Sequence, residues 1–383
     1  MSSLLLKYLS KIKILNLFLF SMENKENNEY FLPETVNRKI VKKGRIKNLV
    51  KQTKKAKIDI LIYNYYIKKE IFILNTLKQI KVIFYNHSCF LFWLYSNSPI
   101  VKTLYESYIN CKYVISLVPF ENDYLFQIWG IKSILMQNFI SYEYENILPS
   151  DLSSKTILMI GRANDKLKRF ELGIKAMFDI IKKIPICQLK IISNLDGVKD
   201  LKNLIYELKL ENNVEFVGFT SIPEIYFRNS SLHIFSSISE SFGLVLCETK
   251  IYGIPNILIG LDYIYISKGG TVIIYDDKPK SIAEEAIKIL ENKEYRKKLG
   301  KEARKSMKNY KNELILKRWI KLILSIYNGD NFYIKLKNEE KQISKETAKN
   351  LLYNQINLLK MRKEEYKNIT IKDIENFSFI KKL

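Results

Sequence analysis

Short apolar runs rich in β-branched residues alternate with segments of helical periodicity from about residue 58 onward. This alternation is typical of a parallel sheet covered by helices. The runs predicted as strands are 58–66, 82–86, 113–118, 133–137, 156–160, 189–193, 214–217, 232–235, 256–259 and 271–275. Two sheets hold so many strands more economically than one. The turn-rich stretch 141–154, which contains Pro149, is the natural junction between two domains.

Between these strands, the spacing of apolar residues predicts helices over 167–183, 199–210, 244–252 and 281–290. Gly253 and Pro255 end the third helix, because glycine supplies a left-handed cap and proline cannot continue the helix. After residue 330 the chain becomes polar and lysine-rich. We therefore expect an α/β protein with an N-terminal domain over 1–148, a C-terminal domain over 149–330 and a basic, partly helical tail over 331–383.

Composition adds a strong positive charge to this picture. The chain has 383 residues, 47% of them hydrophobic, and its 63 Lys and Arg against 40 Asp and Glu give a formal net charge of +23. Such an excess is typical of proteins with an anionic partner, which includes nucleic acid, an acidic membrane surface and a phosphorylated substrate. The excess lies mostly in 38–57, in 291–321 and in the tail, while charges nearly balance over 151–290.

Cysteine and histidine usage excludes several classes of protein. Four widely spaced cysteines and two histidines predict neither a zinc site nor a disulfide framework, and they favour a reducing, cytoplasmic location. No segment reaches the roughly 18 apolar residues that a membrane-spanning helix needs. The run 14–22 resembles a weak signal peptide, but no small-residue cleavage site follows it. A short amphipathic helix leading into a buried strand is the favoured interpretation.

Two strand ends carry candidate chemistry. After strand 156–160 the chain continues with Gly161, Arg162 and, six residues later, Lys168, so cations gather where a helix begins. Ligands of open parallel sheets bind at the carboxyl ends of strands, and helix N-termini attract anions. A phosphate site is one interpretation, and a solvated first helical turn is the other.

The second candidate follows strand 232–235. A polar turn, Ser-Glu-Ser-Phe-Gly over 239–243, leads directly into an apolar helix whose first amides are free to meet an anion. Glu240 lies in the turn and Glu248 about two helical turns later, so two carboxylates can reach one ligand from the loop and from the helix. The order of strand, turn, helix and Gly-Ile-Pro makes this pattern more specific than the two glutamates alone.

Together these motifs resemble the group 1 (family 4) retaining glycosyltransferases of the GT-B fold. The resemblance is carried by Gly161-Arg162 with Lys168, Val217-Gly218-Phe219, Glu240-Ser241-Phe242-Gly243 with Glu248, and Tyr252-Gly253-Ile254-Pro255. It covers about 155–290, with weaker similarity back to about 58 and forward to about 325. It implies two Rossmann-like domains facing each other across a cleft, with a nucleotide-activated sugar bound to the second.

The resemblance also implies a role for each motif residue. Arg162 and Lys168 would hold the donor diphosphate, together with backbone amides at Phe242, Gly243 and Leu244. Glu240 would contact the donor sugar as a catalytic residue. Glu248, with Val217 and Gly218, would bind the ribose and base of the nucleotide. No metal and no cofactor is expected, since two cations at the leaving group can replace a divalent ion.

Two further expectations concern the N-terminal domain. His87, at the end of strand 82–86, lies where the family often places a histidine near the donor sugar, although a structural role is equally open. His233, inside strand 232–235, is interpreted as a packed structural residue. The family's first strand and Gly-rich loop have no counterpart, because residues 1–37 contain no glycine. The N-terminus is therefore interpreted as shortened.

The leading hypothesis is a cytoplasmic hexosyltransferase that moves a sugar from a nucleoside diphosphate donor to a hydroxyl of a glycan or lipid-linked acceptor, in surface polysaccharide or lipopolysaccharide synthesis. A catalytically impaired binding or scaffold protein of the same fold is the alternative. A nucleic-acid-binding protein is a weaker one, because the basic stretch 38–57 lacks interleaved aromatic residues. No nucleic acid partner is therefore expected.

The stretch 38–57 itself carries ten positive side chains and no acidic one. Its apolar residues can form one side of a helix, with the lysines spread round the rest: Ile40, Val41, Ile46, Leu49 and Val50. It is either an ordinary helix with a solvated face or a peripheral attachment to the anionic inner face of the cell membrane.

Overall fold

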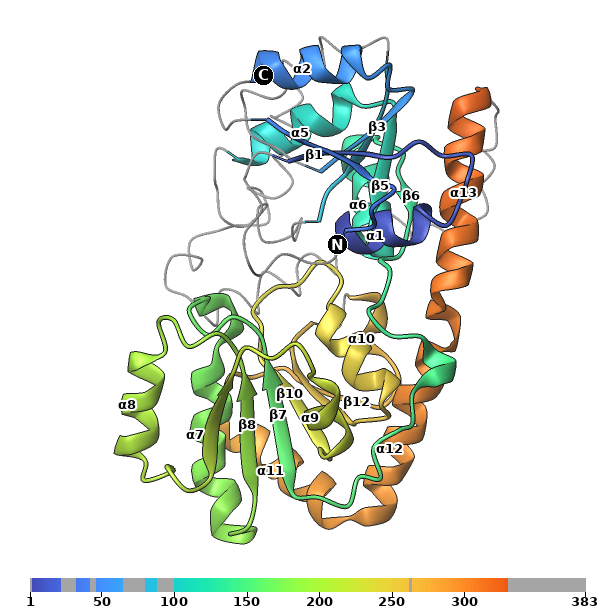
Figure 1. Cartoon of the computed structure of the whole chain (residues 1–383). Helices are drawn as coiled ribbons and strands as arrows, with labels where there is room; N and C mark the ends of the chain where they lie inside the picture. Colours follow the sequence, from blue (N-terminus) through green and yellow to red (C-terminus); the bar gives the residue numbers. More distant parts are fainter. Residues whose placement is uncertain are drawn as a thin grey trace. The chain divides into compact units, whose positions relative to one another are not determined.

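The computed structural model describes residues 2–21, 32–41, 46–64, 80–87, 100–261 and 264–329. The chain forms two compact units, drawn in Figure 1, and each is described by itself. Among the described residues, the first unit contains 2–141 and 312–329, and the second contains 142–311. The tail expected over 331–383 lies outside the described residues, as does Cys89.

The second unit is a six-stranded parallel sheet. Its strands are β7 (Thr156–Ile160), β8 (Gln188–Ile192), β9 (Val214–Gly218), β10 (Leu232–Phe235), β11 (Asn256–Ile259) and β12 (Thr271–Ile274). They lie side by side in the order β12-β11-β10-β7-β8-β9. The order therefore runs outward in both directions from the adjacent pair β7 and β10, which is the arrangement of a doubly wound α/β sheet.

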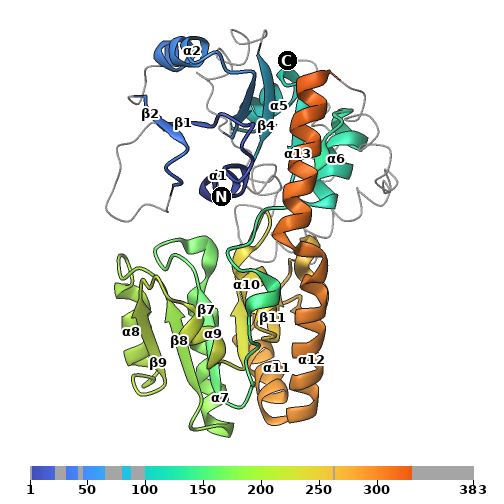
Figure 2. The same cartoon turned by 45° about the vertical axis from the view of Figure 1, so that its right-hand side comes forward.

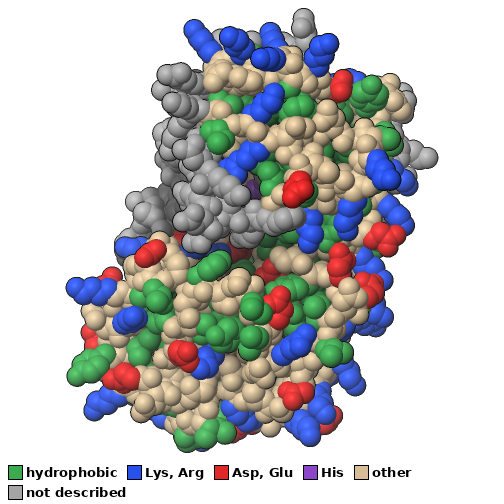
Figure 3. Space-filling view, viewed as in Figure 1, with side chains coloured by type: hydrophobic (Ala, Val, Ile, Leu, Met, Phe, Trp, Pro, Cys, Tyr) green, Lys and Arg blue, Asp and Glu red, His purple; other side chains and the backbone are tan. Residues whose placement is uncertain are grey.

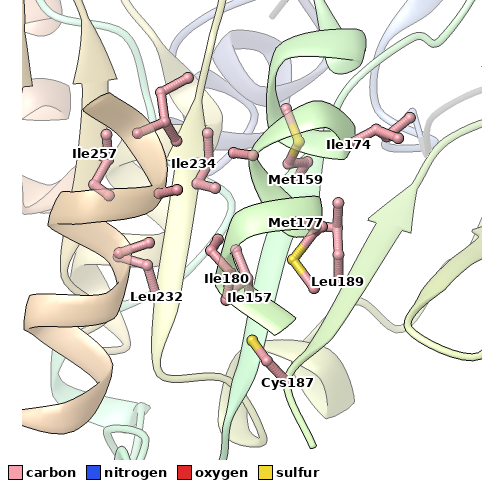
Figure 4. Close-up of a cluster of buried hydrophobic side chains, with 14 of the residues drawn as sticks. Ile157, Met159, Ile174, Met177, Ile180, Cys187, Leu189, Leu232, Ile234 and Ile257 are labelled. Atoms are coloured by element: carbon pink, nitrogen blue, oxygen red, sulfur yellow. The ribbon is translucent and has the colours of Figure 1, made fainter. Parts of the chain in front are cut away.

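Helices cover both faces of this sheet. They are α7 (Phe170–Lys183), α8 (Lys199–Glu207), α9 (Glu224–Arg228), α10 (Leu244–Ile251), α11 (Pro279–Glu291) and α12 (Lys293–Ser306), with 3-10 turns η2 (Tyr144–Asn146), η3 (Lys166–Lys168), η4 (Tyr265–Ser267) and η5 (Met307–Tyr310). Ile157 and Met159 of β7 face the main core that α7 and α11 close, whereas Leu158 between them packs with Tyr252 and Ile254. Figure 4 shows the side of β7 that α7 covers. Burial on both faces explains why these strands are nearly continuous apolar runs.

The first unit has a four-stranded parallel sheet in the order β3-β4-β5-β6. The strands are β3 (Ile60–Tyr63), β4 (Lys81–Tyr85), β5 (Tyr113–Ser116) and β6 (Ile134–Leu135), and the helices are α1 (Ser2–Leu9), α2 (Ile46–Lys55), α5 (Ile100–Asn110), α6 (Pro119–Trp129) and α13 (Asn312–Asn328). Each of the ten predicted strands thus occurs, divided between two sheets as expected. None of the helices that the structure describes is long and apolar enough to cross a membrane.

The division into units differs from the expected domains at α13, which was assigned to the C-terminal domain. Figure 2 shows α13 running along the first unit. Trp319 is fully buried there beside Tyr85, with ring centroids 5.3 Å apart. The side chain of Asn312 fixes the start of the helix, because its Oδ1 accepts from Ile140 N at 2.9 Å and its Nδ2 donates to Tyr8 OH at 2.7 Å. Because of these contacts, α13 belongs to the first unit. The second unit therefore ends at residue 311, whereas the expected C-terminal domain ended at 330.

The basic stretch 38–57 is not one helix, contrary to the expectation. Its first residues belong to β2 (Asn37–Ile40), which pairs in parallel with β1 (Phe18–Ser21) in a separate two-stranded sheet. Ile40 is therefore a strand residue, and the helix α2 starts only at Ile46. Leu49 and Val50 of α2 are buried, whereas the lysines of this helix are exposed to solvent at the edge of the unit seen in Figure 3. Among the described residues of this segment, the expected helix with a buried and an exposed side is α2.

Candidate functional site

The site begins at the carboxyl ends of β7 and β10, the adjacent strands from which the sheet order runs outward. The chain leaves β7 at Gly161 and enters α7 at Phe170, and it leaves β10 at Ser236 and enters α10 at Leu244. Ligands of doubly wound sheets bind at such a switch point, beyond the carboxyl ends of the strands. Both motifs predicted from the sequence lie in these two connections.

Hydrogen bonds hold the two connections together. The backbone amide of Ile238 donates to Leu167 O at 2.8 Å, and the Ser236 hydroxyl donates to Lys168 O at 2.6 Å. Each bond joins residues about 70 positions apart in the chain. The loop after β10 is therefore fixed against the turn that carries Lys168.

Lys168 and Glu240, which the sequence places 72 residues apart, form an ion pair in this structure. Their side chains are only 22% and 15% exposed. The Lys168 ammonium also lies 6.0 Å from the ring centroid of Phe235, within the range of a cation-π contact. A half-buried cation thus lies at the switch point, with a carboxylate as its present partner.

Arg162 lies differently from Lys168. Its side chain is 76% exposed and pairs with Asp165 at 3.0 Å. Asp165 also accepts from the backbone amide of Leu167 at 3.0 Å, so this carboxylate caps the turn η3. Arg162 therefore lies in the same connection as Lys168, but it pairs with a residue three positions away and not with the connection that follows β10.

Phe242, Gly243 and Leu244, whose amides are expected to bind an anion, lie at the N-terminus of α10. Gly243 has φ +80°, a left-handed conformation that residues with a β-carbon rarely adopt, and no side chain caps the helix. Phe242 is buried with its ring centroid 6.2 Å from that of Tyr310. Glycine at the N-cap offers no side chain to the first amides of the helix, which suits an anion.

Glu248 lies in a different environment from Glu240, near two tyrosines and a second glutamate. Burial, with the nearby charges of Glu248 and Glu224, raises the pKa of Tyr142 well above its ordinary value. Burial, with the same two charges, raises the pKa of Tyr252 to about 12. The rings of Tyr142 and Tyr252 meet edge to face with centroids 5.6 Å apart. The two predicted carboxylates thus have separate sets of neighbours.

Val217 and Gly218 end β9, the strand at the far edge of the sheet from β12. Gly218 has φ +88°, and no heavy atom lies within 4 Å of where a β-carbon would be. Phe219 follows with 75% of its surface exposed. An open backbone beside an exposed aromatic ring suits close approach of a flat ligand group.

The two histidines lie in different surroundings. His87 follows β4 in the first unit with its ring against Tyr85, centroids 4.0 Å apart, and burial lowers its pKa to about 4. His233 is fully buried in β10, where its Nδ1 lies 2.7 Å from Asn256 Oδ1. Asn256 also accepts from Thr249 at 2.9 Å, so His233 belongs to a packed polar network inside the second unit.

Three groups near the site were not identified from the sequence. Arg169 is buried next to Lys168, and Tyr142 with Glu224 lies beside Glu248. Lys250 is fully buried in α10, where its ammonium donates to the carbonyls of Ile266 and, at 2.6 Å, Lys268. These carbonyls belong to the loop whose isoleucines pack over the start of α10. In the sequence, Lys250 appears only as a lysine near the end of the predicted helix 244–252, and Arg169 only as one more cation after Lys168. Tyr142 and Glu224 had no signal.

Doubly wound parallel sheets bind their ligands at the switch point, where this chain has a half-buried lysine, a glutamate and the N-terminus of a helix. Residues 142–306 match the family model described as "Glycosyl transferases group 1". Over this part the chain is similar to the group 1 glycosyltransferases, and the expected GT-B fold class is confirmed.

Several proteins of known name or structure are similar to this chain. The chain is 24% identical over 216 residues to poly(glycerol-phosphate) alpha-glucosyltransferase from Bacillus subtilis, a match that covers 55% of this chain and 29% of that protein. Sucrose-phosphate synthase from Thermosynechococcus elongatus superposes with a TM-score of 0.69 at 17% identity, over 85% of this chain and 92% of the other. HepE from Anabaena, solved with UDP and glucose, superposes with a TM-score of 0.61 at 16% identity, over 76% and 87%.

Proposed function

We propose that the chain transfers a hexose-type sugar from a nucleoside diphosphate sugar to a hydroxyl of a glycan or lipid-linked acceptor, with retention of the anomeric configuration and without a metal ion. The observation that carries this proposal is the half-buried Lys168 beside Glu240 at the switch point of a group 1 glycosyltransferase domain. Surface polysaccharide or lipopolysaccharide synthesis, in the cytoplasm, is the process we propose for it.

The chemistry follows from charge development at the donor. Cleavage of the sugar–phosphate bond builds negative charge on the diphosphate and positive charge on the anomeric carbon. Lys168, Arg162 and the amides at the start of α10 would stabilise the departing diphosphate, because fixed cations and a helix N-terminus need no reorganisation in the transition state. Arg162 would leave Asp165 and turn to the diphosphate, and its 76% exposure leaves it room to do so.

The remaining site residues would position the donor. Glu240 would accept a hydrogen bond from a sugar hydroxyl once Lys168 turns to the phosphates, and Glu248 would bind the ribose. Val217 and Gly218 would receive the base. His87, neutral because burial lowers its pKa to about 4, would donate or accept a hydrogen bond at the donor sugar without adding charge.

The comparisons support this proposal at the level of chemistry. The Bacillus subtilis relative is named for glucose transfer to poly(glycerol-phosphate), and the Anabaena structure contains UDP and glucose. We therefore propose UDP-sugars as the first donors to test and a polymer carrying hydroxyl groups as the acceptor.

A transfer assay tests the proposal. Purified wild-type protein is incubated with UDP-, GDP-, ADP- and dTDP-sugars, with and without EDTA, and release of nucleoside diphosphate and the anomer of the product are followed by NMR. We expect turnover of one donor class, resistance to EDTA, and loss of activity in Arg162→Ala and Lys168→Ala. Lys175→Ala, which removes an exposed lysine of α7, is the matched control. Unchanged activity in Lys168→Ala contradicts the proposed role, and nucleotide binding without turnover favours the scaffold alternative.

We also propose that α2 attaches the protein to an anionic membrane surface. Leu49, Val50 and Thr53 hold one side of the helix in the unit, which leaves its lysines in solvent. Each basic residue near an anionic surface contributes about 1 kcal/mol. Sedimentation with vesicles tests this attachment.

The vesicles contain either neutral phosphatidylcholine or 30% phosphatidylglycerol. The test variant reverses three exposed lysines of α2: Lys51→Glu, Lys54→Glu and Lys55→Glu. The control variant reverses three exposed lysines of α12: Lys297→Glu, Lys298→Glu and Lys301→Glu. We expect binding to acidic vesicles that the first variant alone abolishes. Equal binding to neutral vesicles, or equal loss in both variants, contradicts the attachment through α2.

A further inference from the structure

Arg169 is a buried cation for which the proposed reaction has no use. It is 7% exposed and lies between the turn η3 and the helix α7, where its backbone has φ 49° and ψ 49°. This left-handed conformation is unfavourable for a residue with a β-carbon and is readily adopted by glycine. Arginine therefore differs from glycine at this position in the contacts that its side chain makes.

Those contacts join the ends of three strands. The Arg169 Nε donates to Ser236 O at 2.8 Å, in the connection that follows β10. Its NH1 pairs with Asp277 at 2.7 Å, in the loop that follows β12. Arg169 itself follows β7, so one guanidinium links the connections after β7, β10 and β12. Its NH2 is buried and has no hydrogen-bond partner among the described residues.

Ser236 completes the link to the candidate phosphate site. Its carbonyl accepts from Arg169, and its hydroxyl donates to the carbonyl of Lys168 at 2.6 Å. The residues at 168 and 169 therefore hold the start of the β10 connection from two sides. Glu240 lies four residues further along that connection and pairs with Lys168. Loss of the guanidinium would remove one of the contacts that hold Lys168 against the Glu240 loop and would let the two segments move more.

We infer that Arg169 is a positioning residue for the donor diphosphate. It sets the Lys168 ammonium at a fixed place against the β10 connection, and Asp277 neutralises its own charge so that it does not compete for the phosphates. The inference rests on the proposed function in assigning the diphosphate to Lys168. The positioning of Lys168 itself is a property of the free protein and can be measured without a donor.

The first experiment measures the accessibility of the Lys168 amine in the free protein. Wild type, Arg169→Gly and Asp277→Asn are pulsed with an acetylating reagent, and modification of Lys168 is quantified by mass spectrometry against Lys175 of α7 as internal reference. Glycine fits the left-handed backbone, so Arg169→Gly removes the side chain without backbone strain. We expect about a three-fold or larger rise in Lys168 labelling in Arg169→Gly, a smaller rise in Asp277→Asn, and no change at Lys175.

Labelling of Lys168 that stays at the wild-type rate in folded Arg169→Gly overturns the inference. Asp277→Asn keeps the backbone and the arginine. If Arg169→Gly does not fold, labelling of Lys168 in Asp277→Asn at the wild-type rate overturns the inference instead. Arg169→Lys keeps the charge and loses the planar fork that reaches both partners. We expect it to give intermediate labelling.

The second experiment asks whether Arg169 acts through Lys168. Affinity for UDP is measured by calorimetry for wild type, Arg169→Gly, Lys168→Met and the double variant. We expect about a ten-fold loss of affinity from Arg169→Gly in the wild-type background and less than about two-fold in the Lys168→Met background, because coupled residues are not additive. Equal losses in both backgrounds indicate a merely structural arginine and overturn the inference. If wild type binds no nucleoside diphosphate, the proposed function fails, and the labelling experiment alone decides the role of Arg169.

Discussion

Glu240→Gln has opposite expected effects on nucleotide binding and on turnover. Glu240 is the partner of Lys168 in the free protein, so a diphosphate that binds Lys168 displaces this carboxylate and lies next to its negative charge. Glutamine keeps the size of the side chain and removes the charge. Nucleoside diphosphate should therefore bind the variant more tightly, while sugar transfer should become slower.

The magnitude follows from the burial of the pair. Exposed ion pairs contribute about 0 to 1 kcal/mol, whereas loss of one partner of a fully buried pair costs about 3 to 5 kcal/mol. With side chains 22% and 15% exposed, the Lys168–Glu240 pair lies between these limits. If the diphosphate no longer has to displace the carboxylate, a gain of about 1 kcal/mol is expected, which is about five-fold in affinity. Loss of a charged contact to a sugar hydroxyl lowers the transfer rate about 10- to 100-fold.

Calorimetry with UDP and the transfer assay measure the two effects separately. UDP lacks the transferable hexose that Glu240 would contact, so the change in its affinity reports the competition for Lys168. Glu215→Gln is a matched control, because Glu215 pairs with Lys190 in the same unit with 55% of its side chain exposed. We expect no change in either measurement for this control. UDP binding to folded Glu240→Gln that is equal to or weaker than wild type refutes the reasoning.

Three further predictions concern stability and the start of α10. Burial lowers the pKa of Lys250 from 10.5 to about 7, so above pH 7 the unfolded chain binds more protons than the folded chain. The free energy of unfolding should therefore rise from pH 7 to 9 by up to about 1.4 kcal/mol per pH unit. Urea titrations measure this rise, and they should show none in Lys250→Met. A parallel pH dependence in both proteins contradicts this. Gly243→Ala should cost about 1 to 2 kcal/mol and weaken UDP binding, whereas Gly130→Ala, at φ +66°, should cost as much with UDP binding unchanged. Trp319→Ala should lower the free energy of unfolding by about 3 to 5 kcal/mol, and a loss below about 1 kcal/mol contradicts the packing of α13 in the first unit.

The strands were predictable because both faces of a parallel sheet are buried. Each of the ten predicted runs contains a strand, and 156–160, 232–235 and 256–259 agree with the structure at both ends. A strand was expected within 14–22, where β1 lies, but β2 and its pairing with β1 were not predicted. β1 is half-buried throughout and β2 is partly exposed, so neither has the uninterrupted apolar pattern that identified the others.

The placement of α13 could not be predicted for a different reason. Its apolar positions indicate a helix, but its partners Tyr85 and Tyr8 lie more than 200 residues earlier in the chain. Local periodicity carries no information about which core a helix joins. The boundary near residue 311 therefore needed the three-dimensional structure.

The candidate site divides in the same way. Motif spacing identified Lys168 and Glu240, and the adjacency of β7 and β10 explains why residues 72 apart meet. The spacing did not indicate that the two side chains pair with each other in the free protein. Arg169 was visible as one more cation, and its role depends on Asp277, which lies 108 residues later at the end of another strand. A local motif does not reveal contacts between distant residues that the sheet brings together.

A calorimetric titration of UDP tests the central claim most directly, with wild type, Lys168→Ala and Lys175→Ala compared. The account predicts that wild type and Lys175→Ala bind with equal affinity. Lys168→Ala should bind at least about ten-fold more weakly, the loss expected for one charge-assisted hydrogen bond. Equal binding by folded Lys168→Ala, or failure of folded wild type to bind UDP, GDP, ADP or dTDP, contradicts the assignment of a donor diphosphate site at the carboxyl ends of β7 and β10.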